Sequence, residues 1–287
     1  MISQILGAVM LIYLGVAIIF LMAELWSSAR LQFSARTLLW AGAGLQTAAL
    51  LGRWAANYQA ATLHSPPAVF LENLRLVILY APLSNFYESL VFFSWCLPVL
   101  GLIAFRRYLQ GYLGVLIALL ASLLLAYASL GGVDSNIKPL MPALKSNWLL
   151  VHVVTAFLGY AAFALAFGCG VLYLVQERRP RASLPPLPLL DSLMYRATML
   201  GFLLLTLGIL TGAVWAESAW GRYWSWDPKE TWSLITWLIY ATLLHARLLK
   251  GWQGRRIAWL AVLGFAAVMF TYFGVSFLLS GQHSYLT

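Results

Sequence analysis

Long apolar runs separated by short polar segments dominate the pattern of hydrophobic and polar positions in this chain. A helix of about 20 apolar residues crosses the roughly 30 Å hydrocarbon core of a bilayer. Runs of that length predict membrane-spanning helices over about 2–24, 36–54, 86–105, 111–131, 148–175, 197–217, 231–249 and 256–279. The pattern therefore predicts an all-α integral membrane protein, a polytopic bundle of about eight transmembrane helices. We expect residues 1–287 to form one domain, with the first run retained as a helix and not removed as a signal peptide.

The composition agrees with a membrane protein and argues against a soluble one. The chain is 62% hydrophobic and only 9% charged, whereas about a quarter of the residues in soluble domains are charged. Its formal net charge of +9 does not indicate nucleic-acid binding, because the basic residues are scattered in short segments between apolar runs. Cys96 and Cys169 lie inside apolar runs and form no CxxC pair, so we expect neither redox nor zinc chemistry from this chain.

The basic residues predict the orientation of the bundle. One set of connecting segments carries twelve of them: Arg30, Arg36, Arg106, Arg107, Arg178, Arg179, Arg181, Arg196, Arg247, Lys250, Arg255 and Arg256. The other set carries six: Arg53, Arg75, Lys138, Lys145, Arg222 and Lys229. Segments rich in Lys and Arg stay in the cytoplasm, so both termini are expected on the external side.

The most unusual segment is the string W-G-R-Y-W-S-W-D-P-K-E-T-W over residues 220–232, which lies on the predicted external side. Its tryptophans are Trp220, Trp224, Trp226 and Trp232. Tryptophan is common at membrane interfaces, so the string fits an aromatic belt as well as a platform for a large, flat, amphipathic ligand. Asp227 and Pro228 also fit the N-cap and first position of the next helix, with Glu230 at the third position.

Each histidine has a structural and a functional interpretation. His152 enters the fifth predicted span from the external side, and His283 follows the last span on that side. They fit a hydrogen-bonded core histidine and a solvated tail residue, or two axial ligands of a haem iron. His245 is about 22 Å along its helix from Glu230 and fits an interfacial polar residue or a ligand. We interpret His64, in an external loop, as solvated.

The tryptophan string closely resembles the WWD motif of the haem-handling proteins of cytochrome c biogenesis, and within them the CcsA/ResC branch. Two further strings agree with that branch: P-L-S-N-F-Y-E-S-L from Pro82 and the ending G-Q-H-S-Y from Gly281. The resemblance covers about 80–285. It implies that His152 and His283 ligate the haem iron externally. It also implies that His245 helps to hold haem inside the bundle, with a second ligand thought to come from a partner subunit.

The resemblance also implies the function. We expect a component of a cytochrome c synthase that binds haem b, relays it to the external face and presents it for thioether attachment to an apocytochrome c with a CxxCH site. We expect no catalytic residue in this chain, and a separate CcsB/ResB-type membrane partner; thiol-reducing proteins also fit. The expected location is the bacterial plasma membrane, or the thylakoid membrane of a plastid.

Several alternatives stay open. The chain also fits a subunit that passes haem to a chaperone, or a haem-binding membrane sensor or electron-transfer protein. Arg222 and Lys229 are candidates to meet haem propionates. Glu88, in the second string, fits a first-turn carboxylate of a helix as well as a functional residue.

Overall fold

The structure is a computed structural model that describes residues 2–63, 69–109, 111–181, 184–279 and 281. Within these residues all regular structure is helical and no strand occurs. The helices of the first half are α1 (Ile2–Leu25), α2 (Ala29–Thr62), α3 (Phe70–Leu79), α4 (Phe86–Ala104) and α5 (Gly111–Leu130). After a short 3₁₀ turn (Pro142–Leu144) follow α6 (Asn147–Arg178), α7 (Leu187–Trp220), α8 (Pro228–Lys250), α9 (Arg255–Met269), a π-helical segment (Phe270–Gly274) and α10 (Val275–Leu278). The predicted all-α membrane fold is confirmed.

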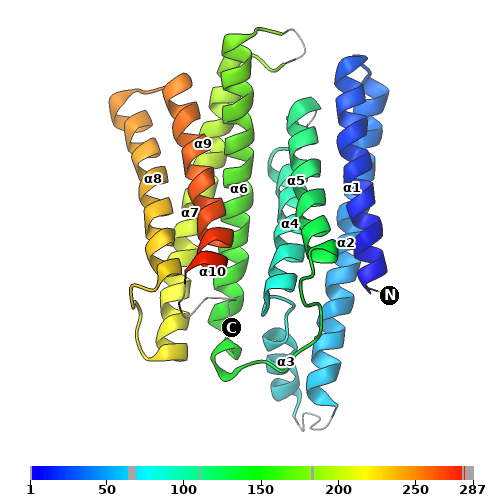
Figure 1. Cartoon of the computed structure of the whole chain (residues 1–287), viewed down its shortest axis with the longest axis vertical. Helices are drawn as coiled ribbons and strands as arrows, with labels where there is room; N and C mark the ends of the chain where they lie inside the picture. The colour runs from blue at the N-terminus through cyan, green and yellow to red at the C-terminus, as the bar shows by residue number, and fades with distance from the viewer. Residues whose placement is uncertain (1, 64–68, 110, 182–183, 280, 282–287) are drawn as a thin grey trace.

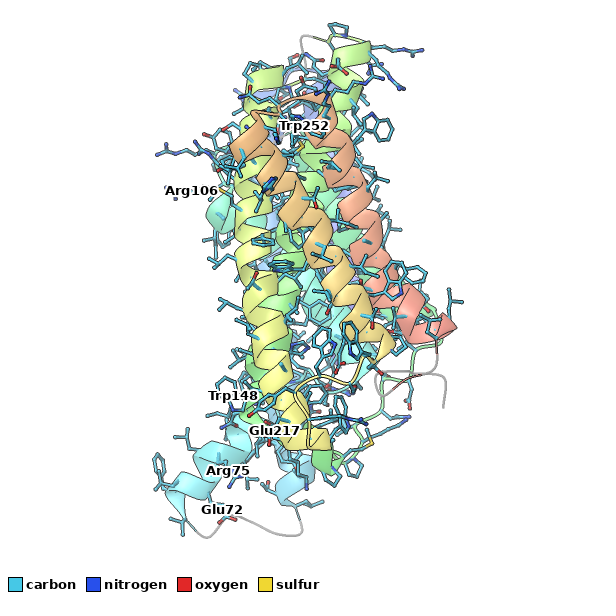
Figure 2. The ribbon with its side chains drawn as sticks, turned by 90° about the vertical axis from the view of Figure 1, so that its left-hand side faces the viewer. Glu72, Arg75, Arg106, Trp148, Glu217 and Trp252 are labelled. Atoms are coloured by element: carbon cyan, nitrogen blue, oxygen red, sulfur yellow. The ribbon has the colours of Figure 1, made fainter. Side chains whose placement is uncertain are left out.

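The long helices alternate in direction and form two groups side by side (Figure 1). One group contains α1, α2, α4 and α5, and the other contains α6, α7, α8 and α9. We call the end that carries α3 and residues 221–227 the motif end. The opposite end, where α1 joins α2, α4 joins α5, α6 joins α7 and α8 joins α9, is the basic end. Figure 2 shows Arg75 at the motif end and Arg106 at the basic end.

Within the described part of the chain, seven helical segments are long and apolar enough to cross a membrane: α1, α4, α5, α6, α7, α8 and the run from Arg255 to Leu278. These correspond to seven of the eight predicted spans. The eighth, over 36–54, lies within α2, which has 34 residues but is less apolar. Helices α1 and α4 both run from the motif end to the basic end, so α2 must run the length of the bundle between them in the opposite direction (Figure 1). A helix not expected from the sequence, α3, lies at the motif end.

Polar residues of α2 are satisfied by neighbouring helices, which explains how a less apolar helix joins the bundle. Gln46 is fully buried. It accepts a hydrogen bond from the Tyr13 hydroxyl at 2.7 Å and donates to the Ser94 hydroxyl at 2.6 Å. Because no water is present in a bilayer core, a polar group there needs such an internal partner. These bonds tie α2 to α1 and α4.

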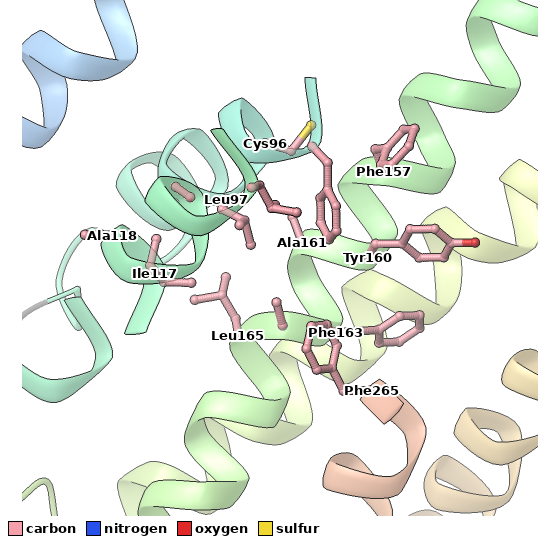
Figure 3. Close-up of a cluster of buried hydrophobic side chains, with 14 of the residues drawn as sticks. Cys96, Leu97, Ile117, Ala118, Phe157, Tyr160, Ala161, Phe163, Leu165 and Phe265 are labelled. Atoms are coloured by element: carbon pink, nitrogen blue, oxygen red, sulfur yellow. The ribbon is translucent and has the colours of Figure 1, made fainter. Parts of the chain in front are cut away.

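Helix α6 connects the two groups of helices through their shared core. Its Phe157 ring lies 5.4 Å from Phe93 of α4, and its Phe163 ring stacks on Tyr240 of α8 with a centroid separation of 3.5 Å. Figure 3 shows α6 side chains between those of α4, α5 and α9. The core also contains Cys96 and Cys169, both buried and without a disulfide partner.

The orientation of this bundle in a membrane can be tested with reporter fusions. We expect fusions after Arg107, Arg179 and Arg255 to be active on the cytoplasmic side, because their segments hold most of the basic residues. A fusion after Lys138 should be active on the external side. An external signal at Arg179 would contradict the predicted orientation.

Candidate functional site

The tryptophan string forms a fixed turn between α7 and α8 at the motif end. Helix α7 ends at Trp220, and Gly221 adopts the left-handed conformation (φ 73°) that ends many helices. Asp227 is the N-cap of α8, and its side chain accepts a hydrogen bond from the Lys229 N–H at 2.9 Å. The Glu230 carboxylate accepts from the Asp227 N–H at 3.1 Å, which completes a capping box. The predicted cap at Asp227 and Pro228 is confirmed.

The turn presents one indole to the surroundings. Trp226 is 68% exposed and has a φ of 59°, a conformation that is uncommon for bulky residues and needs support from its neighbours. Glu230 provides support, since its carboxylate also accepts from the Ser225 N–H at 2.7 Å. Trp224 is half-buried, and its ring meets that of Trp226 edge to face at 5.8 Å.

His152 lies in the first two turns of α6, half-buried against α7. Its Nδ1 is 2.7 Å from the Gly208 carbonyl oxygen. A carbonyl oxygen only accepts, so Nδ1 carries the proton and Nε2 keeps its lone pair. Gly212 makes room for the ring, because a β-carbon there would be 2.6 Å from Nδ1. The backbone of α7 therefore fixes both the position and the tautomer of this imidazole.

Trp215, a buried tryptophan outside the string, contacts both His152 and the first tryptophan of the string. The rings of Trp215 and His152 are stacked, with centroids 6.1 Å apart and an interplanar angle of 15°. Trp215 also meets Trp220 at 4.7 Å, and its Nε1 donates to the Ala143 carbonyl at 2.9 Å. Sequence reasoning missed Trp215, Gly208 and Gly212. The G-x-x-x-G spacing of the two glycines was a usable signal, because such pairs allow close helix packing.

The other predicted site residues lie in different places. The Trp232 ring packs on the Phe270 ring of the π-helical segment, with centroids 4.2 Å apart. This contact is separate from the Trp215–Trp220 and Trp224–Trp226 pairs. His245 is exposed on α8, so its ring points to the surface of the bundle and not into its core. His283 and His64 lie outside the described residues. The described residues contain no group of three or more His, Cys, Asp or Glu side chains that could hold a metal ion.

The two candidate cations for haem propionates differ in surroundings. Arg222 is exposed in the turn between α7 and α8. The Lys229 ammonium instead donates to the Ser276 hydroxyl of α10 at 3.1 Å, so it points toward the last helix. Gly281 lies against the same region, since a β-carbon there would be 2.5 Å from the Asp227 carboxylate. The beginning of the final G-Q-H-S-Y string therefore contacts the motif turn.

The second string, from Pro82, joins three helical segments through a buried ion pair and a buried hydrogen bond. Asn85 is the N-cap of α4, and Glu88 is only 2% exposed. The Glu88 carboxylate accepts from Arg53 Nε at 2.9 Å and from Asn57 Nδ2 at 2.9 Å. Ser89 shares a hydrogen bond of 2.8 Å with the Tyr272 hydroxyl. The string therefore connects α4 to α2 and to the π-helical segment.

Arg53 also holds the connection between α5 and α6. Its guanidinium donates to the Ser135 carbonyl at 2.7 Å and to the Asn136 carbonyl at 3.3 Å. Further along this connection, a hydrogen bond from Lys138 lowers the pKa of the exposed Asp134 carboxyl. The connection is thus fastened to α2 at one end and to Trp215 of α7 at the other, and it leads directly into the turn of α6 that carries His152.

Comparison with known protein families assigns this chain to a family. Residues 83–283 match the model of the family described as cytochrome c assembly protein. The chain belongs to the cytochrome c assembly protein family. The match includes the second string from its second residue onward, His152, the tryptophan string, His245 and His283.

Individual proteins of cytochrome c biogenesis are also similar to this chain in sequence. The cytochrome c biogenesis protein CcsA of Chlamydomonas reinhardtii is 44% identical over 233 residues, which is 75% of this chain and 66% of that protein. The protein of the same name from Synechococcus sp. (strain JA-3-3Ab) is 41% identical over 267 residues, or 72% of this chain and 78% of that protein. The resemblance to CcsA stated from the motifs is confirmed.

The fold is shared with part of one solved structure. The cytochrome c haem lyase CcmF matches with a TM-score of 0.67 and 22% identity. The alignment covers 95% of this chain and 45% of CcmF. At this identity the match establishes a common arrangement of helices, present as part of a longer protein in CcmF.

The buried ion pair makes a specific prediction about stability. Glu88→Ala leaves the Arg53 charge without its partner, which typically costs about 3–5 kcal/mol. Unfolding in detergent can be followed with a thiol-reactive dye, because Cys96 and Cys169 react only when the bundle opens. We expect a clearly lower unfolding temperature for Glu88→Ala. The control is Asp134→Ala, which removes an exposed pair with Lys138; equal unfolding temperatures for the two variants would contradict the assignment.

Proposed function

We propose that this chain is a membrane subunit of a cytochrome c synthase, which binds haem b at the motif end and presents it to apocytochrome c. The observation that carries the proposal is the contact series from His152 through Trp215 to Trp220. It joins an imidazole whose ring is fixed by the Gly208 carbonyl to the tryptophan string. Family membership supports the involvement in cytochrome c biogenesis.

The chemistry of the motif end fits a haem. Haem iron takes axial nitrogen ligands, and a histidine whose second ring nitrogen donates to a carbonyl is held in the ligating tautomer. His152 satisfies this requirement through Gly208. The second axial ligand in this proposal is His283. Its support is the sequence string and the packing of Gly281, two residues earlier, against Asp227.

The indoles are proposed to hold the porphyrin plane. Aromatic side chains bury large apolar areas and prefer offset-stacked or edge-to-face contacts. Trp226 is available for such a contact because it is exposed. The half-buried Trp224 meets it edge to face, and the half-buried Trp220 ends α7 where the turn begins. Arg222, exposed in the turn, is placed to pair with a carboxylate such as a propionate.

In the proposed reaction each cysteine of the CxxCH site adds to one haem vinyl group. A carbon–sulfur bond forms, the thiol hydrogen is transferred to the other vinyl carbon, and no group leaves. The proposed role of this chain is to position the haem: it holds the ring and the iron while the apocytochrome approaches from the motif end. Such a division, in which the protein orients a reactive group, is common for cofactor chemistry.

The proposal includes a partner and a membrane. A CcsB/ResB-type subunit would supply an external domain, and thiol-reducing proteins would keep the acceptor cysteines reduced. The seven long apolar segments support a multi-pass location. We propose the bacterial plasma membrane, or the thylakoid membrane of a plastid.

The proposal is tested by covalent haem on an acceptor. The chain, its partner and an apocytochrome with a CxxCH site are co-expressed, and haem that survives denaturing electrophoresis is measured. We expect holocytochrome with the parent chain and a large loss with His152→Ala, partly restored by imidazole, which can occupy the vacated axial position. His64→Ala is the control. A haem-loaded parent chain that gives no covalent haem on the acceptor would favour the chaperone or electron-transfer alternatives.

His245 is proposed as a relay ligand that acts at the surface of α8. Because its ring is exposed, any haem that it ligates must also touch a second subunit or a molecule outside this bundle. We expect His245→Ala to lower the haem content of the complex purified from cells. Haem added to the purified complex in detergent should restore normal loading, because the motif end is intact.

The haem content of the complex purified from cells, compared with its haem content after haem is added in detergent, distinguishes a relay role of His245 from a structural role. A His245→Ala complex that is fully loaded in cells would remove the relay and leave the motif-end site unaffected. A complex that cannot be loaded by either route would also contradict the relay, since it would indicate damage to the motif end.

A further inference from the structure

A groove on the outside of the bundle lies between α6 and α9, toward the basic end. It is lined by Val171, Leu174, Val175 and Arg178 of α6 and by Trp259 and Val262 of α9, and its volume is about 290 Å³. The α6 residues recur every three or four positions and so lie on one face of that helix. Figure 1 shows α9 beside α6. We call this hollow the α6–α9 groove.

The two helices are in direct contact near the groove. The Phe167 and Phe265 rings are stacked with centroids 4.9 Å apart. A β-carbon on Gly170 would be 3.1 Å from the Ala258 carbonyl oxygen, so the backbones approach closely there. The groove is thus a feature of a tightly packed helix pair, and its walls are apolar except for Arg178.

Arg178 is the charged group at the end of the groove. It is the last residue of α6 and is exposed. Among the described residues it makes no ion pair, whereas neighbouring Arg255 lies 3.7 Å from the Glu177 carboxylate. Residues 176–181 and 250–256 together contain six basic residues and one acidic residue, Glu177. The end of the groove therefore carries a strong excess of positive charge.

We propose that the α6–α9 groove is a binding site for an anionic phospholipid. An acyl chain would lie along the valines and leucine, and the phosphate would pair with the Arg178 guanidinium, whose planar fork of donors suits phosphate oxygens. Trp259 is 43% exposed and would pack beside the chain. Basic residues at the ends of transmembrane helices typically bind such headgroups.

The lining argues against haem as the occupant. None of the six lining residues has an imidazole, thiolate, thioether or phenol group, so the groove offers no ligand of the kinds that hold haem iron. Its single charged group is a cation, and its remaining walls suit a hydrocarbon chain. The charge and the shape therefore favour a lipid, a conclusion that does not depend on the proposed function.

The site can be tested with the full chain in mixed micelles of detergent and zwitterionic lipid. Dibrominated phosphatidylglycerol is titrated in, and quenching of tryptophan fluorescence is recorded; dibrominated phosphatidylcholine is the reference. We expect saturable quenching by phosphatidylglycerol only. Trp259→Phe should remove the saturable component, and Arg178→Gln should weaken binding by roughly fivefold, the effect typical of one arginine near an anionic lipid surface.

The matched control is Arg106→Gln, which removes an exposed arginine at the same end of the bundle but in the other group of helices (Figure 2). It should bind like the parent. The proposal is wrong if both lipids quench equally, if Arg178→Gln binds like the parent, or if Arg106→Gln weakens binding as much as Arg178→Gln. Quenching by haemin that depends on Arg178, without saturable quenching by phosphatidylglycerol, would also overturn it.

Discussion

The close contact between α6 and α7 determines the geometry on which the motif end depends. A β-carbon on Gly201 would be 3.1 Å from the Gly159 carbonyl oxygen, and one on Gly208 would be 3.3 Å from the Ala156 backbone. Small residues at a helix interface let the backbones approach. The approach places the Gly208 carbonyl within hydrogen-bonding distance of His152. The same contact brings Trp215 against the imidazole, so helix packing and site geometry have one cause.

A second constraint is that polar groups inside the bundle need internal partners. The Gln46 network and the Arg53–Glu88 pair meet it with bonds between helices that are distant in sequence. Buried pairs are costly to break and fix relative positions. In this chain the Arg53–Glu88 pair also fastens the connection that enters α6 just before His152. Residues far from the imidazole thus contribute to the position of its helix.

Much of the fold could be predicted from sequence because apolar runs of membrane length leave few alternatives to a helical bundle. The cap at Asp227 was also predictable, since Asp, Pro and Glu at these spacings satisfy the first turn of a helix locally. The helix α3 was missed because it is too short for a membrane span. Glu88 does lie in the first turn of α4, as the sequence suggested. Its ion pair with Arg53 and the role of Trp215 were missed because they depend on contacts between helices, which periodicity does not reveal. The direction of the His245 side chain depends on the same packing.

We propose that the backbone of α7 holds the His152 ring in the orientation needed to ligate a haem iron through Nε2. The most direct measurement is the visible spectrum and haem content of Gly212→Ala, whose added methyl would occupy space 2.6 Å from Nδ1. Gly114→Ala is the matched control, because it adds a similarly close methyl, 2.7 Å from the Phe20 ring, between α5 and α1 and away from the α6–α7 contact. We expect Gly212→Ala to lose the spectrum of histidine-ligated haem, with partial recovery in imidazole, and Gly114→Ala to retain it. Equal haem content and identical spectra in Gly212→Ala and the parent chain would contradict the account.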